Sequence, residues 1–165
     1  MAYDLLVVGG GPCGLAAAIY ARMNGLSVCV FERKRGVVDK ACGEGIMPSG
    51  YRQLSRLGVE VSTAHPFVGI RYLEGESPDV YAEGFFPSQP GYGVRRLELH
   101  EALLNRAREL GVEWRYEAAQ NVSMDEACVS VNGERGDYLF AADGLNSPIR
   151  KQFGLDKRST RTPRY

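Results

Sequence analysis

The chain has 165 residues, of which 44% are hydrophobic and 24% charged, and its 20 basic and 20 acidic residues cancel. This length suits one domain, and the zero net charge argues against a protein that binds nucleic acid through excess positive charge. No apolar run reaches the roughly 20 residues of a transmembrane helix, and the start lacks a signal-peptide pattern. The scattered cysteines form no CxxC pair, so we expect no disulfide framework and a cytoplasmic protein.

A strand–helix–strand unit opens the chain. The apolar run at residues 4–8 predicts a buried strand, and the run at 27–31 predicts a second one. Between them, the helical spacing of apolar residues over 12–24 predicts a helix that Gly25 ends. The unit has the length that a crossover between two parallel strands requires.

The middle of the chain is less regular. Residues 33–47 are polar and predict a long loop, and a helix is expected over 48–57. Strands are expected at 67–73 and 80–86, and the prolines and glycines of 87–93 predict another loop. Leucines at helical spacing predict an amphipathic helix over 96–110, capped by Gly111.

The last third of the chain predicts further strands. Core strands are expected at 112–116 and 138–142, with a short helix from Ser147. Between the two, short antiparallel strands at 122–124 and 128–131 are followed by a turn at Asn132-Gly133.

The glycine-rich segment Gly9-Gly10-Gly11-Pro12-Cys13-Gly14 follows the first strand and opens the first helix. This context favours a dinucleotide-binding turn over an ordinary turn. Gly9 permits the tight turn, Gly11 lets the backbone approach a pyrophosphate, and Gly14 lets the helix pack closely on the sheet. The helix N-terminus, with Cys13 and Gly14, would receive the phosphates.

Glu32 stands just after the second strand, where a carboxylate can accept hydrogen bonds from both ribose hydroxyls of an adenosine. It would repel a 2′-phosphate, which disfavours NADP at this site. Arg33, beside it, could tolerate a phosphate, stack on adenine or lie in solvent. The first unit alone leaves FAD and NAD open as cofactors.

Three later segments narrow the choice. Ala141-Ala142-Asp143-Gly144-Leu145-Asn146-Ser147-Pro148-Ile149-Arg150 follows a core strand and resembles the Asp-Gly fingerprint of the flavoprotein monooxygenase family, which includes para-hydroxybenzoate hydroxylase and the geranylgeranyl reductases. The segment from Val94 to Leu103 is similar to the family's Arg-opened helix. The loop Lys40-Ala41-Cys42-Gly43 resembles the geranylgeranyl reductase branch.

The resemblance implies FAD as cofactor, with NAD(P)H as the electron donor. It implies that Arg96 contacts the pyrophosphate or ribityl chain, that Asp143 helps to hold FAD, and that the Val122 backbone meets the adenine. Cys42 and Gly43 would lie near the isoalloxazine, although a buried structural thiol is an equal reading of Cys42. Cys13, Cys29 and Cys128 are expected to be structural, and His65 and His100 receive no role; His100 is expected on a solvated helix surface.

The expected fold is α/β: a Rossmann-type FAD-binding domain with a parallel sheet, a small antiparallel meander and the start of a substrate-domain sheet. FAD binding is assigned to residues 1–66 and 94–165, and the beginning of the substrate sheet to 67–93. The family's later Gly-Asp motif is absent, so we expect a truncated, N-terminal portion of a family member.

The function that the resemblance implies is the FAD-binding portion of an NAD(P)H-dependent oxidoreductase. A monooxygenase acting on an aromatic or polyketide-like small molecule is favoured. Reduction of a carbon–carbon double bond is one alternative, and a non-catalytic FAD- or ADP-binding fragment is another. The chain alone is expected to show little turnover and to self-associate through exposed apolar surface.

Overall fold

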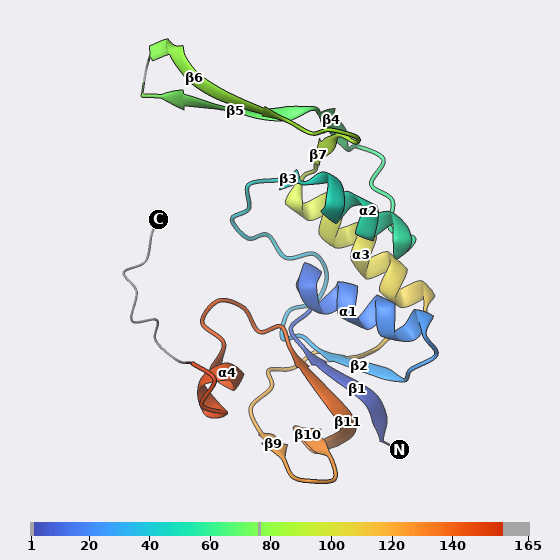
Figure 1. Ribbon diagram of the computed structural model, residues 1–165. Helices are drawn as coiled ribbons and strands as arrows, with labels where there is room; N and C mark the ends of the chain where they lie inside the picture. Colours follow the sequence, from blue (N-terminus) through green and yellow to red (C-terminus); the bar gives the residue numbers. More distant parts are fainter. Residues whose placement is uncertain (1, 76, 157–165) are drawn as a thin grey trace. The chain divides into compact units, whose positions relative to one another are not determined.

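The computed structural model describes residues 2–75 and 77–156 and divides into two units. The first unit comprises Met1–Arg35 and Ala107–Tyr165, and the second comprises Gly36–Arg106. Figure 1 shows the helices and strands of each unit with their labels.

A six-stranded sheet forms the centre of the first unit. Its strand order is β8-β2-β1-β11-β10-β9, where the strands are β1 (Tyr3–Val8), β2 (Val28–Phe31), β8 (Glu113–Arg115), β9 (Val122–Met124), β10 (Val129–Val131) and β11 (Glu134–Ala141). Strand β1 pairs in parallel with both β2 and β11, and β2 pairs in parallel with β8. The predicted parallel sheet is therefore confirmed.

The core of the first unit lies on both faces of this sheet. On one face, Leu6, Cys29 and Phe31 pack with residues of β9, β10 and the helix α4 (Pro148–Gln152). The helix α1 (Pro12–Met23) packs against β1 and β2, and its buried side chains include Leu15, Ala18 and Ile19. Each large apolar side chain buried in this way contributes about 1.5–3 kcal/mol.

Strands β9, β10 and β11 pair antiparallel, which confirms the predicted small meander. Asn132 (φ 49°) and Gly133 (φ 93°) form the turn between β10 and β11 in the left-handed conformations that a tight hairpin needs. The Asn132 side chain also donates to the Ala118 carbonyl and accepts from the Gln120 and Asn121 amides, which fixes the loop before β9.

The second unit contains two helices, α2 (Pro48–Arg56) and most of α3 (Arg96–Glu109), and two small antiparallel sheets. One sheet has the order β3-β7-β4, from β3 (Gly45–Ile46), β7 (Gly91–Gly93) and β4 (His65–Phe67). The other is a hairpin of β5 (Gly69–Glu74) and β6 (Ser77–Phe85).

Several predicted boundaries differ from the structure. The loops expected over 33–47 and 87–93 each contain a short strand, β3 and β7, and the strand expected at 67–73 is two strands, β4 and β5. Strand β11 begins at Glu134, earlier than the expected residue 138. In each case pairing with another strand, rather than local sequence pattern, determines the strand.

Within the described residues, the structure contains no helix with both the length and the hydrophobicity needed to cross a bilayer.

Candidate functional site

The glycine-rich turn lies between the end of β1 and the start of α1. Gly9 has φ 107°, and a Cβ placed on it would overlap the carbonyl oxygen of Ala142, which follows β11. A Cβ on Gly14 would overlap the Gly9 carbonyl oxygen. Gly9 and Gly14 are therefore required by close packing of the turn on α1 and β11.

Gly11 differs from the other two glycines. Its φ of −74° is one that any residue adopts, and a Cβ placed on it would meet no described atom within 4 Å. Packing inside the chain therefore does not explain a glycine here, whereas a group that lies against the backbone would.

The N-terminus of α1 is open to an anion. Gly11 is the N-cap, Pro12 begins the helix, and Cys13 is exposed. Among the described residues, no side chain caps this end and no acidic residue lies in the first turn. Within the described part of the chain, the first amides of α1 therefore lack a side-chain cap, and no acidic residue of the first turn meets the positive end of the helix dipole.

Glu32 lies beside this turn. Its Oε2 accepts a hydrogen bond from the Gly10 amide at 2.8 Å, and its Oε1 accepts one from the Lys34 amide at 3.0 Å. The two bonds orient a half-buried carboxylate next to the turn, with further lone pairs available to a ligand. Arg33 is exposed next to it.

The Asp-Gly segment meets the same turn from β11. The Ala142 amide donates to the Val8 carbonyl at 2.7 Å, and Ala142 touches Gly9. Asp143 Oδ2 accepts from the Ile149 amide at 3.1 Å, whereas its buried Oδ1 has no partner among the described residues. The structure therefore brings Asp143 and the glycine turn together at the carboxyl ends of the neighbouring strands β11 and β1.

Val122 is placed differently from these residues. Its side chain is buried in the core of the first unit, on β9, and its carbonyl accepts a 2.6 Å hydrogen bond from Gln152 Nε2. Contact between its backbone and adenine stays a prediction.

In the second unit, Cys42 and Gly43 lie in an exposed loop before β3. The reading of Cys42 as a buried structural thiol is therefore wrong. Arg96, the first residue of α3, is only 6% exposed, and its Nη1 has no hydrogen-bond partner among the described residues. A buried cation with an unused donor fits an anionic ligand group.

Two residues in this unit were missed by the sequence analysis. His100 is 2% exposed, so the expectation of a solvated histidine is wrong, and its Nδ1 accepts a hydrogen bond from the Val38 amide at 3.0 Å. Glu44 Oε1 accepts one from the Arg96 amide at 2.9 Å. Leu103 and Leu104, three and four residues after His100, were a sign that this side of the helix is covered.

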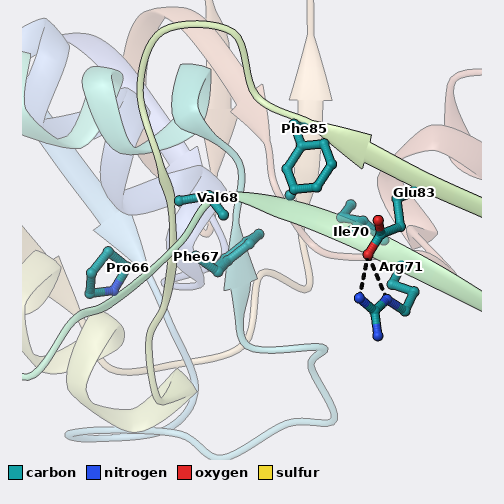
Figure 2. Close-up of a pocket in the computed structure, with 8 residues that line it drawn as sticks. Pro66, Phe67, Val68, Ile70, Arg71, Glu83 and Phe85 are labelled. Carbon is teal, nitrogen blue, oxygen red and sulfur yellow. Dashed lines mark hydrogen bonds and ion pairs between the residues drawn. The ribbon is translucent and has the colours of Figure 1, made fainter.

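A pocket of about 380 Å³ lies at the base of the β5–β6 hairpin (Figure 2). Apolar side chains of Phe67, Val68, Ile70 and Phe85 line it, and the Arg71–Glu83 ion pair, at 2.6 Å, lies at one side. A second pocket, of about 500 Å³, lies among Glu44, Thr63, His65, Gly93, Val94, Arg95 and Glu98.

The cysteines are free thiols, and they differ in environment. Burial raises the pKa of Cys29 to about 11, which keeps it protonated and suits a structural role. No three His, Cys, Asp or Glu side chains within residues 2–75 and 77–156 form a group that could hold a metal ion.

A protein-family model described as an FAD binding domain matches residues 2–164. Menaquinone reductase of Mycobacterium tuberculosis is 32% identical over 163 residues, covering 92% of this chain and 40% of the relative. Digeranylgeranylglycerophospholipid reductase 2 of Methanopyrus kandleri is 32% identical, covering 94% of this chain and 41% of the relative. The FAD-dependent monooxygenase OpS4 of Beauveria bassiana is also 32% identical, over 88% of this chain and 38% of its own length.

Solved structures are similar as well. p-Nitrophenol 4-monooxygenase of Pseudomonas putida superposes with a TM-score of 0.81 at 22% identity, over 93% of this chain and 44% of that one, which shows the shared fold. Anhydrotetracycline hydroxylase of Streptomyces rimosus gives a TM-score of 0.76 at 28% identity, over 93% of this chain and 34% of that one. The chain spans about two fifths of the length of the curated relatives that it matches.

Proposed function

Because this chain belongs to the family of FAD-binding domains, we propose that its first unit holds the adenosine diphosphate half of FAD. The observation that carries the proposal is Gly11: it is a glycine with ordinary φ and open space around it, at a helix N-terminus that no described side chain caps. A diphosphate against the backbone explains both features.

Different residues of the first unit are proposed to contact different parts of the cofactor. The backbone at Gly11, Cys13 and Gly14 would hold the diphosphate, with Gly9 shaping the turn. Glu32, already oriented by two backbone amides, would accept from the ribose hydroxyls. Arg33 would lie beside the adenosine, and Val122 would meet the adenine through its backbone.

Other residues are proposed to hold the rest of the cofactor. The unpaired Oδ1 of Asp143 would accept from a hydroxyl of the ribityl chain. Arg96 would offer its unpaired guanidinium nitrogen to the pyrophosphate or to the ribityl chain, and Cys42 with Gly43 would lie near the flavin ring. The domain assignment of 1–66 and 94–165 to FAD, and 67–93 to the beginning of a substrate sheet, accompanies this proposal.

For the whole protein, we propose an NAD(P)H-dependent oxidoreductase, and first a monooxygenase of an aromatic or polyketide-like small molecule. The bound flavin supplies the redox chemistry, and the protein binds, orients and shields it. The apolar pocket at the hairpin base, lined by Phe67, Ile70 and Phe85, would contribute one wall for such a substrate.

Reduction of a carbon–carbon double bond is a second candidate. Two observations favour it: the exposed Cys42-Gly43 loop resembles the reductase branch, and two of the relatives at 32% identity are named as reductases. Oxygen uptake that depends on substrate and yields an oxygenated product supports monooxygenation. Anaerobic turnover of an alkene supports the reductase.

The chain itself is proposed to bind FAD with little turnover, to self-associate, and to reside in the cytoplasm, where free thiols persist. An NADH or NADPH oxidation assay on the 165-residue chain with added FAD tests the first point. Background-level oxidation together with FAD binding is expected, and brisk oxidation by this chain would overturn the expectation.

A further inference from the structure

We propose that Glu44 is a positioning residue. It fixes the Cys42-Gly43 loop to the N-terminus of α3 and thereby orients Arg96 to contact the cofactor. This inference rests on the proposed function, since it deepens the role assigned there to Arg96. Glu44 is exposed and adjoins the loop, and all its contacts used here lie within the second unit.

Glu44 joins the loop to α3 through backbone and side chain. Its carboxylate Oε1 accepts from the Arg96 amide at 2.9 Å, and its carbonyl accepts from the Val94 amide at 2.7 Å. Its own amide donates to Cys42 Sγ at 3.4 Å. Glu44 thus contacts the loop cysteine, the segment between β7 and α3, and the first residue of the helix.

The bond from the Arg96 amide is a helix cap supplied from a distant part of the chain. The first amides of a helix have no partner inside the helix, and a carboxylate there also meets the positive end of the dipole. Because the capped residue is Arg96 itself, the cap constrains the backbone from which the buried guanidinium extends.

The backbone conformation of Glu44 indicates why a glutamate stands at this position: the contacts of its carboxylate, rather than the needs of the turn, explain it. Glu44 has φ 52°, a left-handed conformation that disfavours any residue with a Cβ. The glycines on either side, Gly43 and Gly45, do not have positive φ values. The unfavourable conformation therefore falls on the one residue of the three that carries a charged side chain, and its contacts to Arg96 and Val94 offset the cost.

The same loop has a second attachment nearer its start. The Val38 amide donates to Nδ1 of the buried His100, on α3. The residues between Val38 and Glu44, which include Cys42 and Gly43, are consequently held to α3 at both ends. Of the two attachments, only Glu44 contacts Arg96 directly.

The test compares Glu44→Gly, Glu44→Gln and the control Glu101→Ala in the full 165-residue chain, with FAD titrated by fluorescence. Glu44→Gly removes the carboxylate but relieves the left-handed backbone, so it should melt close to wild type while FAD affinity falls about fivefold, the effect of losing one helix cap. Glu44→Gln keeps an acceptor oxygen and should restore the affinity. Glu101 is an exposed glutamate on the same helix, and its replacement should leave the affinity unchanged.

A double-mutant cycle with Arg96→Met separates the possible failures. If Glu44 acts through Arg96, Glu44→Gly should have no further effect on FAD affinity once Arg96 is replaced. Full additivity of the two replacements, or an affinity loss that Glu44→Gln fails to restore, would overturn the inference and leave the FAD site standing. A wild-type chain that binds no FAD would overturn the proposed function itself.

Discussion

At the scale of single residues, the three motif glycines are required for different physical reasons. Replacing each of them by alanine should therefore affect stability and FAD affinity differently. Gly11→Ala meets open space at an ordinary φ, so the stability of the chain should stay the same or rise by about 0.4–1 kcal/mol. A ligand against the backbone would, however, meet the new methyl group. We expect FAD affinity to fall at least about tenfold, equivalent to ~1.4 kcal/mol.

Gly14→Ala is the matched comparison for that measurement. Its Cβ would overlap the Gly9 carbonyl, so it should destabilise the chain by about 3 kcal/mol, the upper end for overpacking. Thermal unfolding and FAD titration of both variants distinguish the two roles. A Gly11→Ala chain that binds FAD as tightly as wild type would contradict the assigned role of Gly11.

Replacement of Glu32 tests the proposed contact with the adenosine ribose of FAD. Glu32→Ala removes an acceptor that two amides hold in place, and hydrogen bonds to charged groups contribute about 1.5–3 kcal/mol. ADP and FAD should therefore bind about 10- to 100-fold more weakly in calorimetric titration. The exposed Glu117→Ala is the control, and an equal loss in both variants would argue against a ribose contact.

At the scale of elements, Asp4 and Ser27 join β1 to the residue before β2. Asp4 Oδ2 accepts from the Ser27 hydroxyl and amide, both at 2.6 Å, and these bonds lower the pKa of Asp4, the hydroxyl contributing most. With a folded pKa below the unfolded value of about 3.9, Asp4 stabilises the fold above that pH. Its contribution is lost as the pH falls through the folded pKa.

Asp4→Asn should accordingly lower stability near neutral pH and flatten the decline in stability between about pH 5 and pH 2. Urea unfolding at several pH values measures this change. Asp137→Asn, at an exposed position on β11, is the control. An unchanged slope for Asp4→Asn would show that this contact does not govern acid stability.

Elements formed by local pattern could be predicted from the sequence, and those formed by distant pairing could not. The β1–α1–β2 unit follows from two apolar runs and a helical stripe within about thirty residues. Strands β3 and β7 have two and three residues and pair with each other across more than forty positions, so neither has a local signal.

The residues of the candidate site likewise fall into those that the sequence pattern could place and those that it could not. Gly9, Gly14 and Glu32 could be placed together because the motif spans one crossover. His100 was misjudged because its burial depends on how the helix packs, and the left-handed conformation of Glu44 is not a property of glutamate. Tertiary contacts that override residue preference account for both misses.

At the scale of the whole molecule, we expect the β5–β6 hairpin to cause association between copies of the chain, because apolar side chains are exposed on it. It exposes Tyr72, Leu73, Val80, Tyr81 and Phe85, with Tyr72 and Phe85 each 68% accessible. An isolated two-stranded hairpin with apolar side chains in solvent is marginally stable and adheres to other surfaces.

Sedimentation of the chain at tens of micromolar should therefore show self-association, which replacement of Tyr72 and Val80 by lysine should reduce. Replacement of the exposed Tyr138 and Met124, in the first unit, by lysine is the control. A wild-type chain that sediments as a monomer across this range would contradict the prediction.

Direct titration of the purified 165-residue chain with FAD, followed by flavin fluorescence, tests whether the chain holds FAD through its first unit. We expect saturable binding of FAD that ADP competes away and that Gly11→Ala weakens at least about tenfold without loss of the fold. A folded chain whose titration with FAD gives no saturable change in flavin fluorescence, yet which binds NADH, would contradict FAD binding and favour an NAD-binding dehydrogenase.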